Sequence, residues 1–215
     1  MIKVFLGDIT PLKNKTTFES FYNKANNTRR EKIDRLNFIE DKCLSLASAI
    51  LLDLALKENN IYDYNLVYNE NGKPFLESGE AFFSISHSKD MAMCVISDSE
   101  VGCDIERVKE VDFRLANRRF HQKEITKLQE IADKSQKTDM FFRLWTIKES
   151  FVKLVGEGLK LPLGCFFVDF DKNKVINNDK EFCFFEITKV KGYKCSVCSK
   201  TSQKIEIFKI DFNNV

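Results

Sequence analysis

Two acidic residues in a short apolar segment are the clearest candidates for chemistry in this chain. Residues 101–106 alternate between apolar Val, Cys and Ile and the residues Gly102, Asp104 and Glu106, which is the two-residue period of a strand with one buried face. Asp104 and Glu106 then point the same way, with Cα atoms roughly 6.6 Å apart. Both carboxylates can address one hard cation, directly or through a water, and Gly102 is expected to leave that face open. A solvated strand face is the ordinary alternative for such a pair.

A third carboxylate lies on a predicted helix over residues 141–155. The apolar residues of this helix recur at three- and four-residue steps: Phe141, Leu144, Ile147, Phe151 and Leu154. Trp145, Glu149 and Lys153 are spaced four apart and share a different face. An exposed Glu–Lys pair is common and stabilises a helix by only about 0.2–0.5 kcal/mol. A Trp on the same row is less expected of a purely solvated face, which favours a functional surface.

Polar residues gather where another predicted strand ends. Ser86, His87 and Ser88 follow the strand at 81–85, and hydroxyls, an imidazole and backbone N–H groups can converge there on phosphate oxygens. A Ser-His-Asp hydrolase is the competing interpretation of these residue types. Ser and His that are adjacent in sequence seldom face each other, however, and the chain has no nucleophile-elbow motif.

A hairpin is predicted upstream of these residues. Asn71-Gly72 is a turn signal between a strand at 64–68 and the segment that begins with Lys73-Pro74. Gly72 permits close approach of the backbone to a ligand, and Pro74 fixes the chain that follows. An ordinary hairpin tip accounts for both residues but gives Lys73 no task.

Taken together, these motifs resemble those of the 4′-phosphopantetheinyl transferases, in the larger, pseudo-dimeric (surfactin-type) class. The shared pieces are Gly72-Lys73-Pro74, Ser86-His87-Ser88, Gly102-x-Asp104-x-Glu106 and Trp145-x-x-Lys148-Glu149-x-x-x-Lys153. The resemblance implies an α+β fold with two similar α/β halves that form a pseudo-dimer, each a small antiparallel-rich sheet packed on a long helix. It places the N-terminal half at residues 1–107 and the C-terminal half at 108–215.

The resemblance also implies an activity. Such an enzyme transfers 4′-phosphopantetheine from coenzyme A to a serine of an apo acyl or peptidyl carrier protein and releases adenosine 3′,5′-bisphosphate. Three gathered carboxylates raise each other's pKa unless a divalent cation neutralises them, and Mg²⁺ suits oxygen ligands. The implied ligands are Asp104, Glu149 and Glu106, the last directly or through water. The implied catalytic residues are Glu149 as the base, Asp104 within the metal site, and Lys153 beside the pyrophosphate.

The remaining implied contacts are to coenzyme A. They fall on Arg29, Lys32, Ser45, Gly72, Lys73, Pro74, Ser86, His87 and Lys153. One residue departs from the pattern: Lys89 follows Ser88 where many relatives have Gly, which puts the conformation of that turn in question. A basic segment after the two acids, with Arg114 and Arg118, lies where relatives meet the carrier; a solvated basic helix is the alternative.

Two other functions stay open on the same residues. A non-catalytic module that binds coenzyme A or a carrier protein would not need Asp104, Glu106 and Glu149 together. A metal-dependent phosphoesterase would break down coenzyme A without any carrier. Incubation with coenzyme A, magnesium and an apo carrier separates both from the transferase.

Composition limits the classes further. A formal charge of +2 gives no global field for nucleic acid or a membrane surface. The longest apolar run, Leu46–Leu56, is far shorter than the ~20 residues of a membrane span. Seven scattered Cys favour a reducing cytoplasm. Cys195-x-x-Cys198 is the closest pair, and without a second pair we expect strand residues rather than a zinc site. We expect a monomer.

The supporting elements follow from periodicity. A capping box of Thr28 and Glu31 predicts one long amphipathic helix that runs to about Leu54. The polar segment 133–139 is predicted to be a loop. An opening strand covers residues 1–8, and further strands are predicted at 166–170, 182–187, 193–198 and 205–212.

Overall fold

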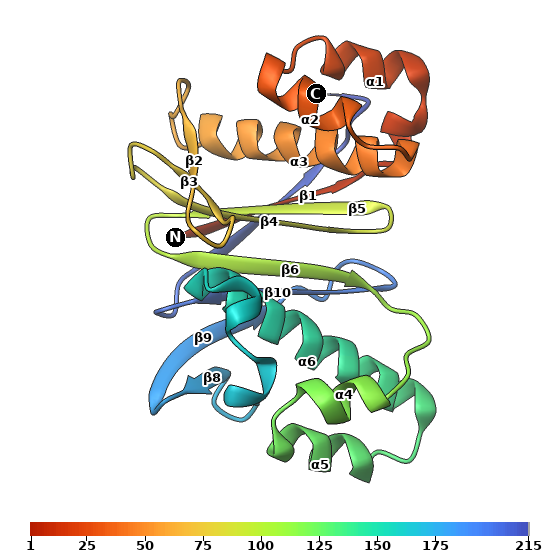
Figure 1. The fold of residues 1–215 in the computed structure, drawn as a ribbon, viewed down its shortest axis with the longest axis vertical. Helices are drawn as coiled ribbons and strands as arrows, with labels where there is room; N and C mark the ends of the chain where they lie inside the picture. The colour runs from red at the N-terminus through yellow and green to blue at the C-terminus, as the bar shows by residue number, and fades with distance from the viewer. Residues whose placement is uncertain (215) are drawn as a thin grey trace.

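The chain forms four layers, helices, sheet, sheet and helices (Figure 1). The computed structural model describes residues 1–214. The elements of the first half are β1 (Ile2–Asp8), η1 (Thr10–Lys13), α1 (Lys15–Tyr22), α2 (Asn27–Asp34), α3 (Ile39–Lys57), β2 (Leu66–Tyr68), β3 (Pro74–Leu76), β4 (Phe82–Ser88), β5 (Met91–Ser97) and β6 (Val101–Arg107). The second half contains α4 (Arg114–Arg119), α5 (Gln122–Glu130), α6 (Lys134–Val155), η2 (Gly158–Lys160), η3 (Leu163–Cys165), β7 (Phe167–Asp169), β8 (Lys174–Asn177), β9 (Lys180–Glu186), β10 (Tyr193–Ser199) and β11 (Ile205–Ile210). The predicted α+β class is confirmed.

Each half lends one strand to the other half's sheet. The first sheet has the order β11-β1-β5-β4 and the second β6-β10-β9-β8-β7, while β2 and β3 form a separate hairpin. By chain position β6 belongs to the first half, yet it pairs with β10, and β11 returns to lie parallel to β1. Each sheet therefore contains strands from both sides of the boundary predicted between residues 107 and 108. The division of the chain into two halves at this boundary stays a prediction.

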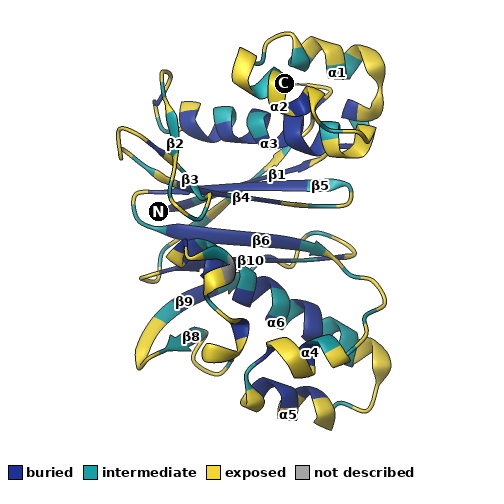
Figure 2. Cartoon of the chain, viewed as in Figure 1, coloured by how far each residue is buried: buried dark blue, intermediate teal, exposed yellow. Residues whose placement is uncertain are grey.

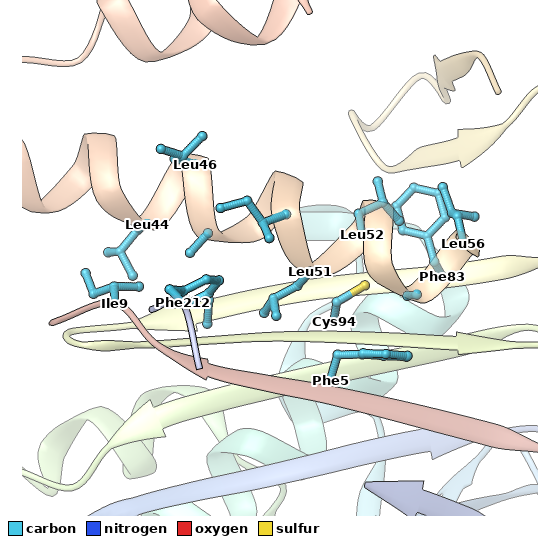
Figure 3. Packing of buried hydrophobic residues seen from close by; sticks show 14 of the residues in the cluster. Phe5, Ile9, Leu44, Leu46, Leu51, Leu52, Leu56, Phe83, Cys94 and Phe212 are labelled. Atoms are coloured by element: carbon cyan, nitrogen blue, oxygen red, sulfur yellow. The ribbon is translucent and has the colours of Figure 1, made fainter. Parts of the chain in front are cut away.

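Three apolar clusters hold the layers together. One lies between α3 and the first sheet, one between the two sheets, and one between α6 and the second sheet. Strand β1 shows why both faces of a sheet must be apolar: Phe5 packs under α3, whereas Val4 and Leu6 face the other sheet. The first cluster appears in Figure 3, and the buried strands and inner helix faces are dark blue in Figure 2. Burial of each large aliphatic side chain stabilises the fold by about 1.5–3 kcal/mol.

The prediction of one helix from Thr28 to about Leu54 is wrong. Helix α2 ends at Asp34, and α3 begins at Ile39 after Phe38, which is extended with φ −97° and ψ 139°. The N-cap of α2 is Asn26, whose side chain accepts a hydrogen bond from Arg29 N, so Thr28 does not form the capping box. The apolar period continues across the break, which is why periodicity alone did not reveal it.

The predicted loop at 133–139 is also wrong. Asp133 is the N-cap of α6, and its side chain accepts a hydrogen bond from Gln136 N at 2.7 Å. The polar composition reflects the exposed first turns of a helix rather than a loop. Sequence analysis also missed α1 and β8.

The cysteines are mostly buried, and none of them forms a disulfide. Cys195 and Cys198 both lie buried in strand β10, as expected for strand residues. All seven Cys are free thiols, and six of them are buried. No helix within residues 1–214 combines the length and apolarity needed to cross a bilayer.

Candidate active site

A pocket of about 550 Å³ lies between elements of the first half, which include β6, and helix α6 of the second half. Its wall is built from α2, α3, the β2–β3 hairpin, β4, β6 and the last turn of α6. The residues predicted from sequence that line it are Arg29, Lys32, Ser45, Gly72, Pro74, Ser86, His87, Asp104, Glu106 and Lys153. Residues from six separate elements thus converge on one cavity. Lys73 and Glu149 are not on this wall.

The floor of the pocket is a junction between two edge strands from different sheets. Hydroxyl groups of β4 accept hydrogen bonds from backbone N–H groups of β6, at 3.1, 3.3 and 3.2 Å. The pairs are Ser84 with Cys103, Ser86 with Ile105, and Ser88 with Arg107. This serine seam (Ser84, Ser86 and Ser88) replaces a backbone ladder, and it leaves the hydroxyl hydrogens of Ser86 and Ser88 free to reach the acids of β6.

Asp104 lies at the centre of this junction with only 4% of its surface exposed. Its Oδ1 accepts hydrogen bonds from Ser86 Oγ at 2.8 Å and from Lys153 Nζ at 2.7 Å. Its Oδ2 is buried and has no hydrogen-bond partner among residues 1–214. A buried carboxylate oxygen without a partner is costly, so Asp104 is arranged to meet a further ligand.

The two other acids, Glu106 and Glu149, are harder to ionise than exposed glutamates. Ser88 Oγ donates to Glu106 Oε2 at 2.8 Å. Burial raises the pKa of Glu106, and the charge of Asp104 adds to the shift. Burial also raises the pKa of Glu149, again with the charge of Asp104 as the next cause. In both residues burial is the largest cause of the shift, and the nearby charge of Lys153 offsets only part of it.

This donor set fits a divalent cation. The orphaned Oδ2 of Asp104 and the raised pKa values of the two glutamates are what a hard, oxygen-binding ion would relieve. Within residues 1–214, no three carboxylate, imidazole or thiol side chains already converge closely enough to hold a metal. The ammonium of Lys153 lies on Asp104 instead.

Lys153 is held at this site by two acceptors. Burial is the largest influence on its pKa and would lower it, but the negative charges around it, Asp104 first, and the hydrogen bond to Asp104 together outweigh burial and leave the pKa raised. An ammonium carries three N–H donors, and Ser86 Oγ and Asp104 Oδ1 take two of them. One donor therefore stays available to a ligand in the pocket.

Gly102 has a different role from the one predicted. The residue was expected to leave the face of β6 open, but helix α6 covers it. A Cβ on Gly102 would lie 2.1 Å from Ser150 O and 2.3 Å from Leu154 N. Glycine is required because the helix backbone approaches the strand directly, and this contact brings α6 close to Asp104.

The side of the pocket formed by α2 and α3 is basic and contains a second unpaired polar atom. Ser45 is 9% exposed, and its Oγ has no hydrogen-bond partner within residues 1–214. Burial lowers the pKa of Lys32, and the charge of Arg29 lowers it further, which marks a concentration of positive charge. Partial burial, with the charge of Lys153, lowers the pKa of His87 from its ordinary value. This wall can receive phosphate oxygens.

Sequence reasoning missed part of the wall. Asp41, Tyr68, Phe83 and Ile85 line the pocket together with the predicted residues. Phe83 and Ile85 alternate with Ser84 and Ser86 along β4, so the strand period was the signal that could have placed them. Asp41 lies one helical turn before Ser45, on the same face of α3.

The turn at Lys89 shows how the chain accommodates its departure from glycine. Lys89 adopts φ 55°, the left-handed conformation that glycine adopts without strain. The neighbouring Asp90 fixes the turn: it accepts a hydrogen bond from Lys13 Nζ at 2.7 Å, and its backbone N–H donates to the Tyr193 hydroxyl at 3.2 Å. The β4–β5 turn thus forms with Lys in place of Gly.

Comparison with known proteins defines the class. Residues 100–203 match the family model of the 4′-phosphopantetheinyl transferase superfamily, and the chain belongs to this family. It is 32% identical over 206 residues to the 4′-phosphopantetheinyl transferase gsp of Aneurinibacillus migulanus, covering 93% of this chain and 86% of that protein. It is 31% identical to the 4′-phosphopantetheinyl transferase Sfp of Bacillus subtilis, covering 84% of each. A more distant relative is the L-aminoadipate-semialdehyde dehydrogenase-phosphopantetheinyl transferase of Xenopus laevis, 30% identical over 62% of this chain and 50% of that protein.

Proposed function

We propose that this protein transfers 4′-phosphopantetheine from coenzyme A to a serine hydroxyl of an apo acyl or peptidyl carrier protein, with release of adenosine 3′,5′-bisphosphate. The observation that carries the proposal is the environment of Asp104, a buried carboxylate with one unpaired oxygen at the end of a pocket lined by basic and hydroxyl side chains. A module that only bound coenzyme A would have no use for this unpaired acid or for the two acids with raised pKa values beside it.

Mg²⁺ is the proposed cofactor, and Asp104, Glu106 and Glu149 are its proposed ligands. When bound, the ion would hold the pyrophosphate and stabilise the charge that develops as the bridging oxygen leaves. Asp104 Oδ2 is the atom that most needs such a partner. Glu106 is oriented by Ser88 from the serine seam, whereas Glu149 would join it from α6.

In this proposal Lys153 stabilises negative charge on the phosphate, and Glu149 accepts the proton of the serine. The third N–H of Lys153 would donate to a phosphate oxygen of coenzyme A, which offsets charge on the departing phosphate. Glu149 would accept the proton of the carrier serine at a carboxylate oxygen. Burial raises the pKa of Glu149, which makes it a stronger base than an exposed glutamate.

Arg29, Lys32 and Ser45 would bind the phosphates and nucleotide of coenzyme A, together with Gly72, Pro74 and His87. Ser45 Oγ has no hydrogen-bond partner within residues 1–214, and Arg29 and Lys32 bring positive charge to the pocket wall. Ser86 is a special case, because its hydroxyl already donates to Asp104 Oδ1 and accepts from Ile105 N and Lys153 Nζ. Any phosphate contact by Ser86 must therefore replace one of these bonds.

Carrier docking is proposed for the exposed face of α4. Arg114 and Arg118 lie one turn apart there, shortly after the acids of β6. Arg114 is paired with the exposed Asp112 at 2.7 Å, a pair that solvent screens and an acidic carrier can displace. A monomer in a reducing cytoplasm completes the proposal, supported by seven free thiols; no nucleic acid or membrane partner is part of it.

The test is a mass measurement on the carrier. The protein is incubated with coenzyme A, Mg²⁺ and each of a panel of apo carriers, and intact carriers are weighed. The proposal expects one carrier to gain the mass of one phosphopantetheine group, and no gain when its acceptor serine is replaced by Ala. Breakdown of coenzyme A in the absence of any carrier would indicate a phosphoesterase instead, and binding without mass gain would indicate a non-catalytic module.

A further inference from the structure

The β2–β3 hairpin makes three hydrogen bonds to the end of helix α6. Asn69 Nδ2 and Asn71 Nδ2 donate to Gly156 O at 3.0 and 3.1 Å, and Lys73 Nζ donates to Leu154 O at 3.1 Å. All three donors belong to the first half of the chain and both acceptors to the second. The last carbonyls of a helix have no partner within the helix, so the hairpin supplies partners that α6 lacks.

The hairpin is rigid enough to act as a cap. Asn69 Oδ1 accepts hydrogen bonds from the backbone N–H groups of Asn71 and Lys73, both at 2.9 Å. Gly72 adopts φ +81°, which closes the turn. These bonds hold the Asn69 side chain and the backbone of Asn71 and Lys73 within the turn.

The contact is also close on the helix side. Gly156 ends α6 with φ +79°, and a Cβ there would lie 3.1 Å from Lys73 Cδ. Burial lowers the pKa of Lys73, but a cation at a helix C-terminus is favoured by the helix dipole. The side chain predicted to contact the nucleotide thus points to the helix backbone, away from the pocket wall.

The opposite side of the hairpin lines the pocket through Tyr68, Gly72 and Pro74. The turn of α6 that it caps carries Lys153, next to Leu154. We propose that Asn69, Asn71 and Lys73 are positioning residues, which hold the last turn of α6 so that Lys153 meets Asp104 and the substrate. This inference rests on the proposed transferase function, and it assigns Lys73 to the helix rather than to the nucleotide.

The two roles for Lys73 predict different effects. A nucleotide contact that is lost raises the KM for coenzyme A. A lost positioning contact lowers kcat, because Lys153 and Glu149 are then misplaced in the transition state. It also loosens the end of α6 in the free protein, which hydrogen exchange detects without any substrate.

The experiment compares four variants of the full-length protein. Lys73→Met removes the ammonium but keeps the chain length, and Lys73→Arg restores a donor. Asn69→Asp keeps the Oδ1 acceptor of the turn but replaces the donor to Gly156 with an oxygen. Glu70→Gln is the matched control, because Glu70 lies on the same hairpin and pairs only with the exposed Lys160 among the salt bridges of residues 1–214.

We expect Lys73→Met and Asn69→Asp each to lower kcat by about tenfold, the loss for one hydrogen bond at the upper end of the neutral range or the lower end of the charged range, with KM for coenzyme A changed less than about twofold. Amides at 154–157 should exchange at least about tenfold faster in the free variants. Lys73→Arg should recover most of kcat, and Glu70→Gln should match the unaltered protein.

An increase in KM with unchanged kcat and unchanged exchange would overturn the inference and return Lys73 to the nucleotide. If Lys73→Met fails to fold, Asn69→Asp and Lys73→Arg decide by the same two readouts. Should the unaltered protein transfer nothing to any carrier, the proposed function fails, while the exchange measurement still reports whether the hairpin caps α6.

Discussion

Helix α6 carries two lysines that each pair with a buried acid, and the pairs differ in every other respect. The side chains of Lys148 and Glu124 are 0% and 1% exposed, whereas those of Lys153 and Asp104 are 32% and 6% exposed. Burial lowers the pKa of Lys148 to about 8 despite its partner. For Lys153 the acidic neighbours outweigh burial, and the pKa is raised.

Hydrogen bonding separates the pairs more sharply than burial. Both oxygens of Glu124 are satisfied, by Lys148 and by the backbone N–H groups of His121 and Val168. Lys148 also donates to Phe166 O at 2.8 Å and lies 4.3 Å from the centre of the Phe166 ring. Asp104, by contrast, keeps an unpaired oxygen. A complete network joins α5, α6 and β7 as structure, and the incomplete one is what a site for a ligand requires.

The largest effect should follow from breaking the complete pair. Lys148→Met leaves Glu124 charged and without its cation in the core, and we expect the free energy of unfolding to fall by about 3–5 kcal/mol. Chemical denaturation of the variant measures this loss. The double change Lys148→Met with Glu124→Gln removes the stranded charge and should recover part of the stability. If Lys148→Met costs less than about 1 kcal/mol, the pair is not the structural link described here.

The second effect concerns the incomplete pair and should appear in catalysis instead. Asp104→Asn keeps the shape and leaves an oxygen for Ser86 and Lys153, but it removes the charge that a cation needs. We expect kcat to fall by about 10²–10³-fold or more, with the free energy of unfolding changed by less than about 1 kcal/mol. Steady-state rates of carrier modification and urea unfolding curves on one preparation check both. Near-normal turnover would remove Asp104 from the chemistry.

The sequence pointed to Asp104 and Lys153 as site residues, though not to their contact, and it indicated no role for the pair of Lys148 and Glu124. Asp104 shares a strand face with Glu106, and Lys153 shares a helix face with Glu149, so their intervals pointed to a site. Lys148 belongs to the same helix motif as Lys153 but has no such acid on its own face. Lys148 lies four residues after Leu144 and three before Phe151, on the apolar stripe of the helix. That position was the available signal for a buried cation, but its partner is 24 residues away in another helix, and no local pattern shows such a contact.

Features that depend on residues close together in the chain were predictable. Features that depend on contacts between distant elements were not. The period of β6 placed Asp104 and Glu106 correctly on one strand. The same period said nothing of α6, so the role of Gly102 was misjudged. The serine seam joins strands of two different sheets through Ser84 and its neighbours, an arrangement that a single strand pattern cannot contain. Short-range periodicity thus predicts helices and strands. The contacts that form the site depend on how those helices and strands pack against one another.

The smallest expected effect tests the charge of the incomplete pair through pH. An acid with a raised pKa in the folded state stabilises the fold while it is protonated, below its ordinary value near 4.5, and this contribution is lost as pH rises through the raised value. Glu106 and Glu149 therefore weaken the metal-free protein at neutral pH, and a bound cation should reverse the penalty. We expect Mg²⁺ to raise the Tm by a few degrees at neutral pH, and by progressively less as pH falls toward 4.5.

A matched pair of variants makes this measurement specific to the site. Asp104→Asn should abolish the Mg²⁺-dependent rise in Tm at every pH. Glu110→Gln should leave it unchanged, because Glu110 is an exposed acid that pairs with Lys134 at 3.0 Å. A rise of equal size from pH 4.5 to 8, or one that survives in Asp104→Asn, would mean that Mg²⁺ acts elsewhere on the protein. In that event the contrast between the two lysine pairs would still describe stability, but the unpaired oxygen of Asp104 would need a different ligand.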